Sequence, residues 1–149
     1  MRWGVVCSFV LILGAAACGS GAVGVVPYTD LTRQAGPLEF TRIYRSLYRT
    51  PLSLNKLLEQ MNPGRPIRLP YIDWQRQEVY LVAAGPRSST GYDLRIVRVR
   101  DNGDNLTVVV RERTPSLGDP VQARVTYPFR LIALPRNDKP VTLKWLGRP

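Results

Sequence analysis

Apolar and polar residues alternate through the second half of the chain, which is typical of β-strands with one buried face. In residues 106–113, Leu106, Val108 and Val110 alternate with Thr107 and Arg111. Strands are also predicted over residues 78–84, which form a short apolar run, and over residues 92–100, 124–133 and 141–145. Residues 92–100 and 106–113 flank the turn-forming sequence DNGDN, so we expect these two strands to form a hairpin.

One segment shows a helical period instead. In LSLNKLLEQM, Leu54, Leu57, Leu58 and Met61 recur at the spacing i, i+3, i+4, i+7, which places them on one face of a helix. Thr-Pro precedes the segment and Asn-Pro-Gly follows it, as expected at the start and end of a helix. We therefore predict one helix, with its apolar stripe packed on a sheet.

The order of these elements indicates a mainly β fold. Residues 38–48 mix apolar and polar positions and are expected to form a further strand. No helical pattern separates the later strands, which argues against a parallel sheet. We expect a compact antiparallel β-sandwich or small barrel with one short N-terminal helix packed on it, forming a single domain over residues 38–149.

The N-terminus has the layout of a bacterial export signal. Arg2 is followed by an apolar run over residues 5–13 and by small residues immediately before Cys18. The apolar run is shorter than the roughly 20 residues of a membrane-spanning helix. We therefore expect a signal peptide over residues 1–17, followed by a flexible tether over residues 18–37.

The sequence AAAC before the predicted cleavage point resembles a lipobox. We expect Cys18 to carry a covalent diacylglycerol or another acyl lipid such as palmitate, which would anchor the protein to a membrane of the bacterial cell envelope, on its periplasmic or surface side. Plain secretion and a retained membrane anchor are the alternatives. Cys7 leaves with the signal peptide, so no thiol remains to form a disulfide.

The composition argues against catalysis and a metal site. The chain has no histidine, and after processing it has no free cysteine. The carboxylates that could act as acid or base are scattered singly along the chain: Asp73, Glu78, Asp93 and Glu112. We expect a protein that is not an enzyme and that uses no cofactor apart from the lipid.

The chain is strongly basic, with a formal net charge of +10. Seven arginines lie on the expected strands: Arg95, Arg98, Arg100, Arg111, Arg113, Arg124 and Arg130. They either form an electropositive surface for an acidic partner or anionic envelope, or are the solvated face of a half-buried sheet. Aromatic residues do not alternate with them, which argues against nucleic-acid binding.

The stretch GPRSSTGYDLRI connects two predicted strands. Its small and turn-forming residues suit a tight turn, and loops of a rigid β scaffold often carry its contacts. We therefore predict that this loop binds a partner, with Tyr92 as aromatic anchor. The predicted contact residues are Gly85, Arg87, Ser88, Ser89, Thr90, Gly91 and Tyr92.

The region around this loop resembles the C-terminal domain of PrcB-type protease-complex accessory lipoproteins. The matching residues are Asp73, Trp74, Gly85, Arg87, Gly91, Tyr92, Thr114, Pro115, Tyr127 and Pro128, within a core of about residues 73–145. Ser88, Ser89 and Thr90 stand where that family has Pro, Thr and Gly, which we expect to loosen the loop.

The resemblance implies a lipid-anchored envelope protein that binds and stabilises or assists an exported protease or another exported protein. The Thr90-Gly91-Tyr92 sequence is also similar to the loop of chagasin-type cysteine-protease inhibitors, which makes an inhibitor the alternative function. A second alternative is an electropositive module that binds the envelope surface.

Overall fold

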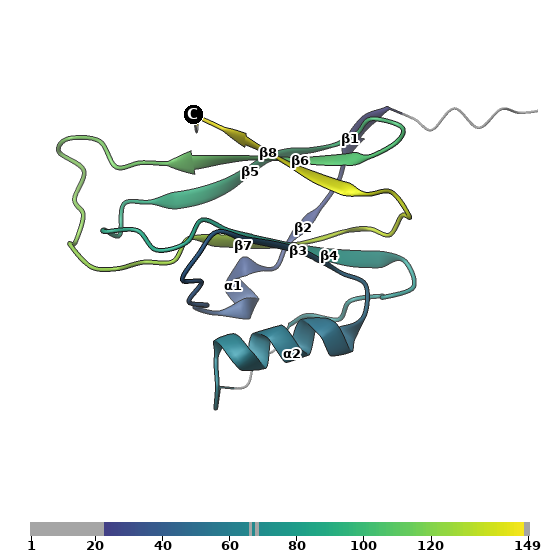
Figure 1. Ribbon diagram of the computed structural model, residues 1–149, viewed down its shortest axis with the longest axis horizontal. Helices are drawn as coiled ribbons and strands as arrows, with labels where there is room; N and C mark the ends of the chain where they lie inside the picture. Colours follow the sequence, from purple (N-terminus) through teal and green to yellow (C-terminus); the bar gives the residue numbers. More distant parts are fainter. Residues whose placement is uncertain (1–22, 66, 68, 148–149) are drawn as a thin grey trace, which may run out of the picture.

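The computed structural model describes residues 23–65, 67 and 69–147, and it is a β-sandwich with helices on one side. Figure 1 shows three layers: sheet A, sheet B and a pair of helices beneath sheet B. Residues 1–17, predicted to be a signal peptide, and Cys18 lie outside the described residues. The strands are β1 (Gly24–Val26), β2 (Thr29–Asp30), β3 (Tyr44–Tyr48), β4 (Gln77–Ala83), β5 (Asp93–Asp101), β6 (Leu106–Arg113), β7 (Phe129–Pro135) and β8 (Val141–Leu146).

The two sheets each contain four strands, in the order β1-β5-β6-β8 in sheet A and β2-β7-β4-β3 in sheet B. Sheet B is covered on both faces, so successive residues of its central strands are buried in opposite directions. On β4, Val79 and Leu81 pack toward the helices, whereas Tyr80 and Val82 pack toward sheet A. This double burial explains the nearly continuous apolar sequence of β4.

The predicted sandwich is confirmed, and the described strands do not close into a barrel. The expectation of a purely antiparallel fold is wrong at one pair, because β8 runs parallel to β6. Strand β7, which separates β6 and β8 in the sequence, lies in the other sheet. The chain therefore returns to sheet A in the direction of β6, so a parallel pair forms without an intervening helix.

The ordered domain begins before residue 38. Strand β1 pairs with β5 in sheet A, and strand β2 pairs with β7 in sheet B, so the chain crosses between the sheets within a few residues. Leu31 and Ala35 are buried in the core beneath sheet B. The expectation of a flexible tether over residues 18–37 is therefore wrong from Gly24 onward.

The predicted helix is confirmed as α2 (Pro51–Met61). The Thr50 hydroxyl accepts a hydrogen bond from the Ser53 amide at its start, and Leu54, Leu57 and Leu58 are buried. A four-residue helix, α1 (Thr32–Ala35), was not predicted. Neither helix in the described part of the chain has the length and apolarity needed to cross a membrane.

Candidate functional site

Two loops lie side by side at one end of the sandwich, and we call them the loop pair. Residues 85–92 connect β4 to β5, and residues 114–128 connect β6 to β7 (Figure 1). The Arg87 amide donates to the Thr126 carbonyl at 2.8 Å, and the Thr126 amide donates to the Arg87 carbonyl at 2.9 Å. The Ala84 amide also donates to the Pro128 carbonyl, so the loops continue the pairing of β4 with β7.

The residues that depart from the PrcB pattern also take part in this pairing. The Ser89 carbonyl accepts a hydrogen bond from the Thr126 hydroxyl at 2.8 Å. Thr90 makes two hydrogen bonds with Gln122, one from its amide and one to its hydroxyl. Ser89 and Thr90 therefore attach the first loop to its neighbour, while Ser88 is exposed.

Two glycines allow the close packing. Gly91 lies where a Cβ atom would come within 2.5 Å of Val121 Cγ1 and 2.6 Å of Pro115 Cβ. Gly85 has a positive φ of 79°, and a Cβ atom there would lie 3.2 Å from the Arg42 carbonyl carbon. Both positions require glycine for steric reasons.

An ion pair fixes the base of the first loop to sheet A. Arg87 binds the Glu112 carboxylate through two guanidinium nitrogens, one of them Nη2 at 2.9 Å from Oε2. The hydrogen bonds to Glu112 raise the pKa of Arg87, so its charge is held firmly. Only 19% of the Arg87 side chain and 11% of the Glu112 side chain are exposed.

These contacts change the role of several predicted binding residues. Arg87, Ser89 and Gly91 hold the loops together, while Pro86 and Ser88 are exposed. Tyr92 and Thr90 are half-buried. Several residues of the family motif therefore hold the two loops together.

The exposed apolar residues at this end of the sandwich were not predicted from the sequence. Leu117, Val121 and Val125 project from the second loop, and Ile43 lies beside Gly85 of the first. Leu117 is fully exposed. The signal that could have indicated them was loop length, because a loop of about 15 residues without regular structure is uncommon and often functional.

Two grooves border the second loop. One has a volume of about 480 Å³ and lies between Thr90, Gly91 and Tyr92 on one side and residues 119–121 on the other. The second, of about 350 Å³, lies between residues 37–39 and residues 124–127. The loop pair therefore offers an uneven surface with exposed apolar groups.

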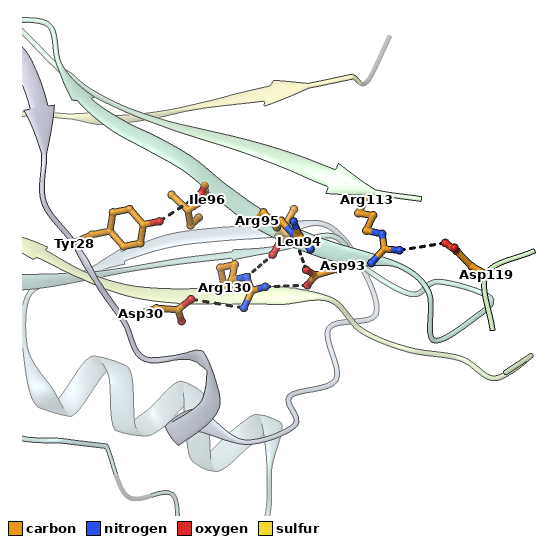
Figure 2. Close-up of polar contacts among 9 residues, drawn as sticks. All are labelled: Tyr28, Asp30, Asp93, Leu94, Arg95, Ile96, Arg113, Asp119 and Arg130. Carbon is orange, nitrogen blue, oxygen red and sulfur yellow. Dashed lines mark hydrogen bonds and ion pairs between the residues drawn. The ribbon is translucent and has the colours of Figure 1, made fainter. Parts of the chain in front are cut away.

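Five of the seven predicted arginines share the outer face of sheet A, but Arg130 and Arg124 do not. Arg130 crosses from β7 to sheet A and donates to the Leu94 carbonyl and to Asp93, and it also pairs with Asp30 (Figure 2). Arg124 lies in the second loop. The sequence pattern placed Arg130 with the other arginines, but its strand, β7, lies in sheet B.

Each of the four carboxylates considered as catalytic candidates makes other contacts in the structure. Glu78 is completely buried and binds Arg49 and Asn137. The Asp73 carbonyl accepts two amide hydrogen bonds in the turn before β4, and Asp93 and Glu112 bind arginines. No three His, Cys, Asp or Glu side chains among the residues described are grouped as a metal site would require.

The fold and the loop pair together define a β-sandwich domain with two hydrogen-bonded loops at one end. Residues 79–135, which run from β4 to the end of β7 and include both loops, match the PrcB C-terminal family. The predicted resemblance to PrcB-type proteins is therefore confirmed for this segment of the chain. No curated protein and no solved structure matches the chain.

Proposed function

We propose that this chain is a non-enzymatic accessory protein that binds and assists an exported protease through its loop pair. Membership of residues 79–135 in the PrcB C-terminal family supports association with a protease complex. The observation that carries the proposal is the loop pair itself. Its backbone is held by hydrogen bonds, and its outer surface presents Leu117, Val121 and Val125 to solvent.

A surface of this kind suits stable protein binding for two reasons. Loops already held in one conformation lose little entropy when a partner binds. Exposed apolar side chains beside grooves can be buried by a partner, which supplies the favourable free energy.

The same geometry argues against the inhibitor alternative. Chagasin-type inhibitors insert a loop into an active-site cleft. Here residues 87, 89 and 90 are bonded to residues 122 and 126, so the first loop does not project alone. The accessory role is therefore the function the geometry favours.

Binding through the loop pair can be tested by affinity capture from the producing cells. The chain is expected to retain an exported protease, whose amount or activity falls when the chain is deleted. The double substitution Leu117→Asp and Val125→Asp should abolish capture. Leu52→Asp is the control, because Leu52 is equally apolar and exposed but lies on α2.

Three results would contradict the proposal. In the first, both the double variant and the control retain the protease. In the second, the captured protein has no peptidase activity. In the third, adding the chain lowers peptidase activity, which would support the inhibitor function instead.

We propose separately that Cys18 carries an acyl lipid that anchors the protein to the cell envelope. The small residues before Cys18 and the apolar run that precedes them support this modification. A Cys18→Ala chain should appear in the soluble fraction or stay unprocessed, and it should no longer incorporate labelled palmitate. A Cys18→Ala chain that is fully processed and still membrane-bound would overturn the proposal.

A further inference from the structure

The outer face of sheet A is lined by cationic side chains. The inward residues of its strands, among them Leu94, Val99, Val108 and Val110, pack against sheet B. The residues between them point outward, because side chains alternate across a strand. The exposed cations on this face, which we call the cationic face, are Arg95, Arg98, Arg100, Arg111, Arg113 and Lys144.

Most of this charge is not neutralised within the protein. Arg95 pairs with Asp93 at 3.2 Å, and Arg113 pairs with Asp119 at 3.2 Å. The other four cations have no carboxylate within 4.0 Å in the part of the chain that the structure describes: Arg98, Arg100, Arg111 and Lys144. The face is therefore a surface with an excess of positive charge.

Two arginines of the cationic face lie opposite each other, which does not stabilise the folded sheet. This arrangement indicates that the arginines serve binding instead. Arg95 lies directly opposite Arg111 in the register of β5 and β6. Like charges at opposed positions destabilise a sheet pair, and both side chains are exposed. A bound anionic surface would relieve this repulsion.

The start of the domain places this face close to the proposed lipid anchor. Strand β1 is the edge of sheet A, and Val25, which is 74% exposed, lies in register with Arg100. Gly24 is six residues after Cys18, a separation that spans at most about 20 Å when fully extended. A membrane that holds Cys18 is therefore within reach of the cationic face.

The domain could meet the membrane end-on, through the β5–β6 turn, or face-on, through the cationic face, and the charges at these two places differ. Gly24 is paired with Asp101 at the end of β5, beside the turn that contains Asp104. Asp101 is neutralised by Lys139, with 2.6 Å between Nζ and Oδ2, but Asp104 is exposed. An end-on orientation would bring this acidic turn to the headgroups, whereas a face-on orientation brings the arginines.

We propose that the cationic face binds anionic lipid headgroups and holds the sandwich flat on the membrane. The proposal rests on the proposed lipid anchor for its setting. Asp93 lies about 26 Å along β5 from Asp101, at the strand rise of about 3.3 Å per residue. The loop pair next to Asp93 therefore lies at the rim of the bound face, where a partner protein can reach it (Figure 1).

The test is co-sedimentation of an acyl-free chain with lipid vesicles. A chain beginning at residue 19 contains every helix and strand described, and with them both core clusters. It should bind vesicles in which about a third of the lipid is phosphatidylglycerol, and not vesicles of phosphatidylcholine alone. Binding should weaken as salt is added, because exposed charges are screened.

Matched charge variants test the face itself. The triple substitution R98Q, R100Q and R111Q should weaken binding about a hundredfold, or roughly fivefold for each cation. The control R33Q, K56Q and R65Q removes the same charge from exposed positions on α1, on α2 and after α2. Its binding should change no more than about twofold, and both variants should keep the unfolding temperature of the parent chain within a few degrees.

Each of the following outcomes would overturn the proposal. The acyl-free chain could fail to bind anionic vesicles, or the two triple variants could lose binding equally, which would indicate net charge alone. The face variant could bind vesicles normally and lose capture of the protease, which would assign the face to an acidic protein partner. These outcomes are separate from failure of the loop pair or of Cys18, which the capture and fractionation experiments report.

Discussion

Arg87 and Thr126 pair through both of their backbone hydrogen bonds, at 2.8 and 2.9 Å, and so join two loops that are far apart in the sequence. The pairing continues β4 and β7, the central strands of sheet B and among the most deeply buried in the molecule. The loop pair is therefore attached to the most rigid part of the domain. This relationship makes the proposed binding surface sensitive to substitutions that never touch a partner.

Gly91→Ala should separate the two loops. The added Cβ atom would lie 2.5 Å from Val121 Cγ1 and 2.6 Å from Pro115 Cβ, so one loop must move. We expect a loss of about 1 to 3 kcal/mol in the free energy of unfolding, measured by urea denaturation. Faster hydrogen exchange of the Thr90 amide should accompany it.

Gly24→Ala is the control for this prediction, because nothing lies within 4 Å of its added Cβ atom. Its stability should change by no more than about 0.5 kcal/mol. Equal effects of the two substitutions would contradict the steric role of Gly91.

Arg87→Met should remove one ion-pair partner of the largely buried Glu112 carboxylate. We expect the free energy of unfolding to fall by about 1 to 3 kcal/mol, less than for a completely buried pair because both side chains are slightly exposed. Arg113→Met, which breaks the more exposed pair with Asp119, should cost no more than about 1 kcal/mol. A larger loss from Arg113→Met than from Arg87→Met would refute this ranking.

Arg130→Met should weaken the contact between the sheets. Arg130 donates to the Leu94 carbonyl, and β1 is too short to pair with that part of β5 (Figure 2). The substitution leaves this carbonyl without its donor and removes the contacts with Asp93 and Asp30, so we expect a loss of about 2 kcal/mol.

Arg130→Lys offers a second measurement at the same position. Lysine keeps the charge but cannot donate in the several directions of a guanidinium, so it should recover only part of the stability. Full recovery by lysine would show that charge alone is sufficient.

Tyr80→Phe should alter the dependence of stability on alkaline pH. Burial raises the pKa of Tyr80 to about 12, while in the unfolded chain it is near 10. Folding therefore favours the neutral phenol, and this contribution is complete below about pH 10 and is lost as the pH rises toward 12. At about pH 11, the free energy of unfolding of the parent chain should therefore fall by about 1.4 kcal/mol more than that of the variant.

At about pH 8 the same variant should be at least as stable as the parent chain. The Tyr80 hydroxyl is buried and has no hydrogen-bond partner among the residues described, so its removal leaves no acceptor or donor unpaired. Tyr71→Phe, at a position that is 91% exposed, is the control for removing a tyrosine hydroxyl. No difference between the Tyr80 and Tyr71 variants would contradict this prediction.

The features that the sequence predicted correctly are mostly local. Helix α2 follows from the spacing of four apolar residues and from Thr50 at its start, and β6 follows from simple alternation. The motif around Gly85, Arg87 and Gly91 identified the family, because each of these residues meets a strict backbone or ionic requirement. Such requirements are visible in a sequence as residue type and spacing.

The sequence alone thus determined where the main elements form, which of their faces are apolar, and which family the central segment resembles. Only the tertiary structure decided that β8 lies parallel to β6, that the sandwich begins at Gly24, and that Arg130 joins the two sheets. It also decided that residues 114–128 share a surface with residues 85–92. The physical reason is that alternation specifies the two faces of a strand, whereas its neighbours depend on pairing and burial between residues that are distant in the chain.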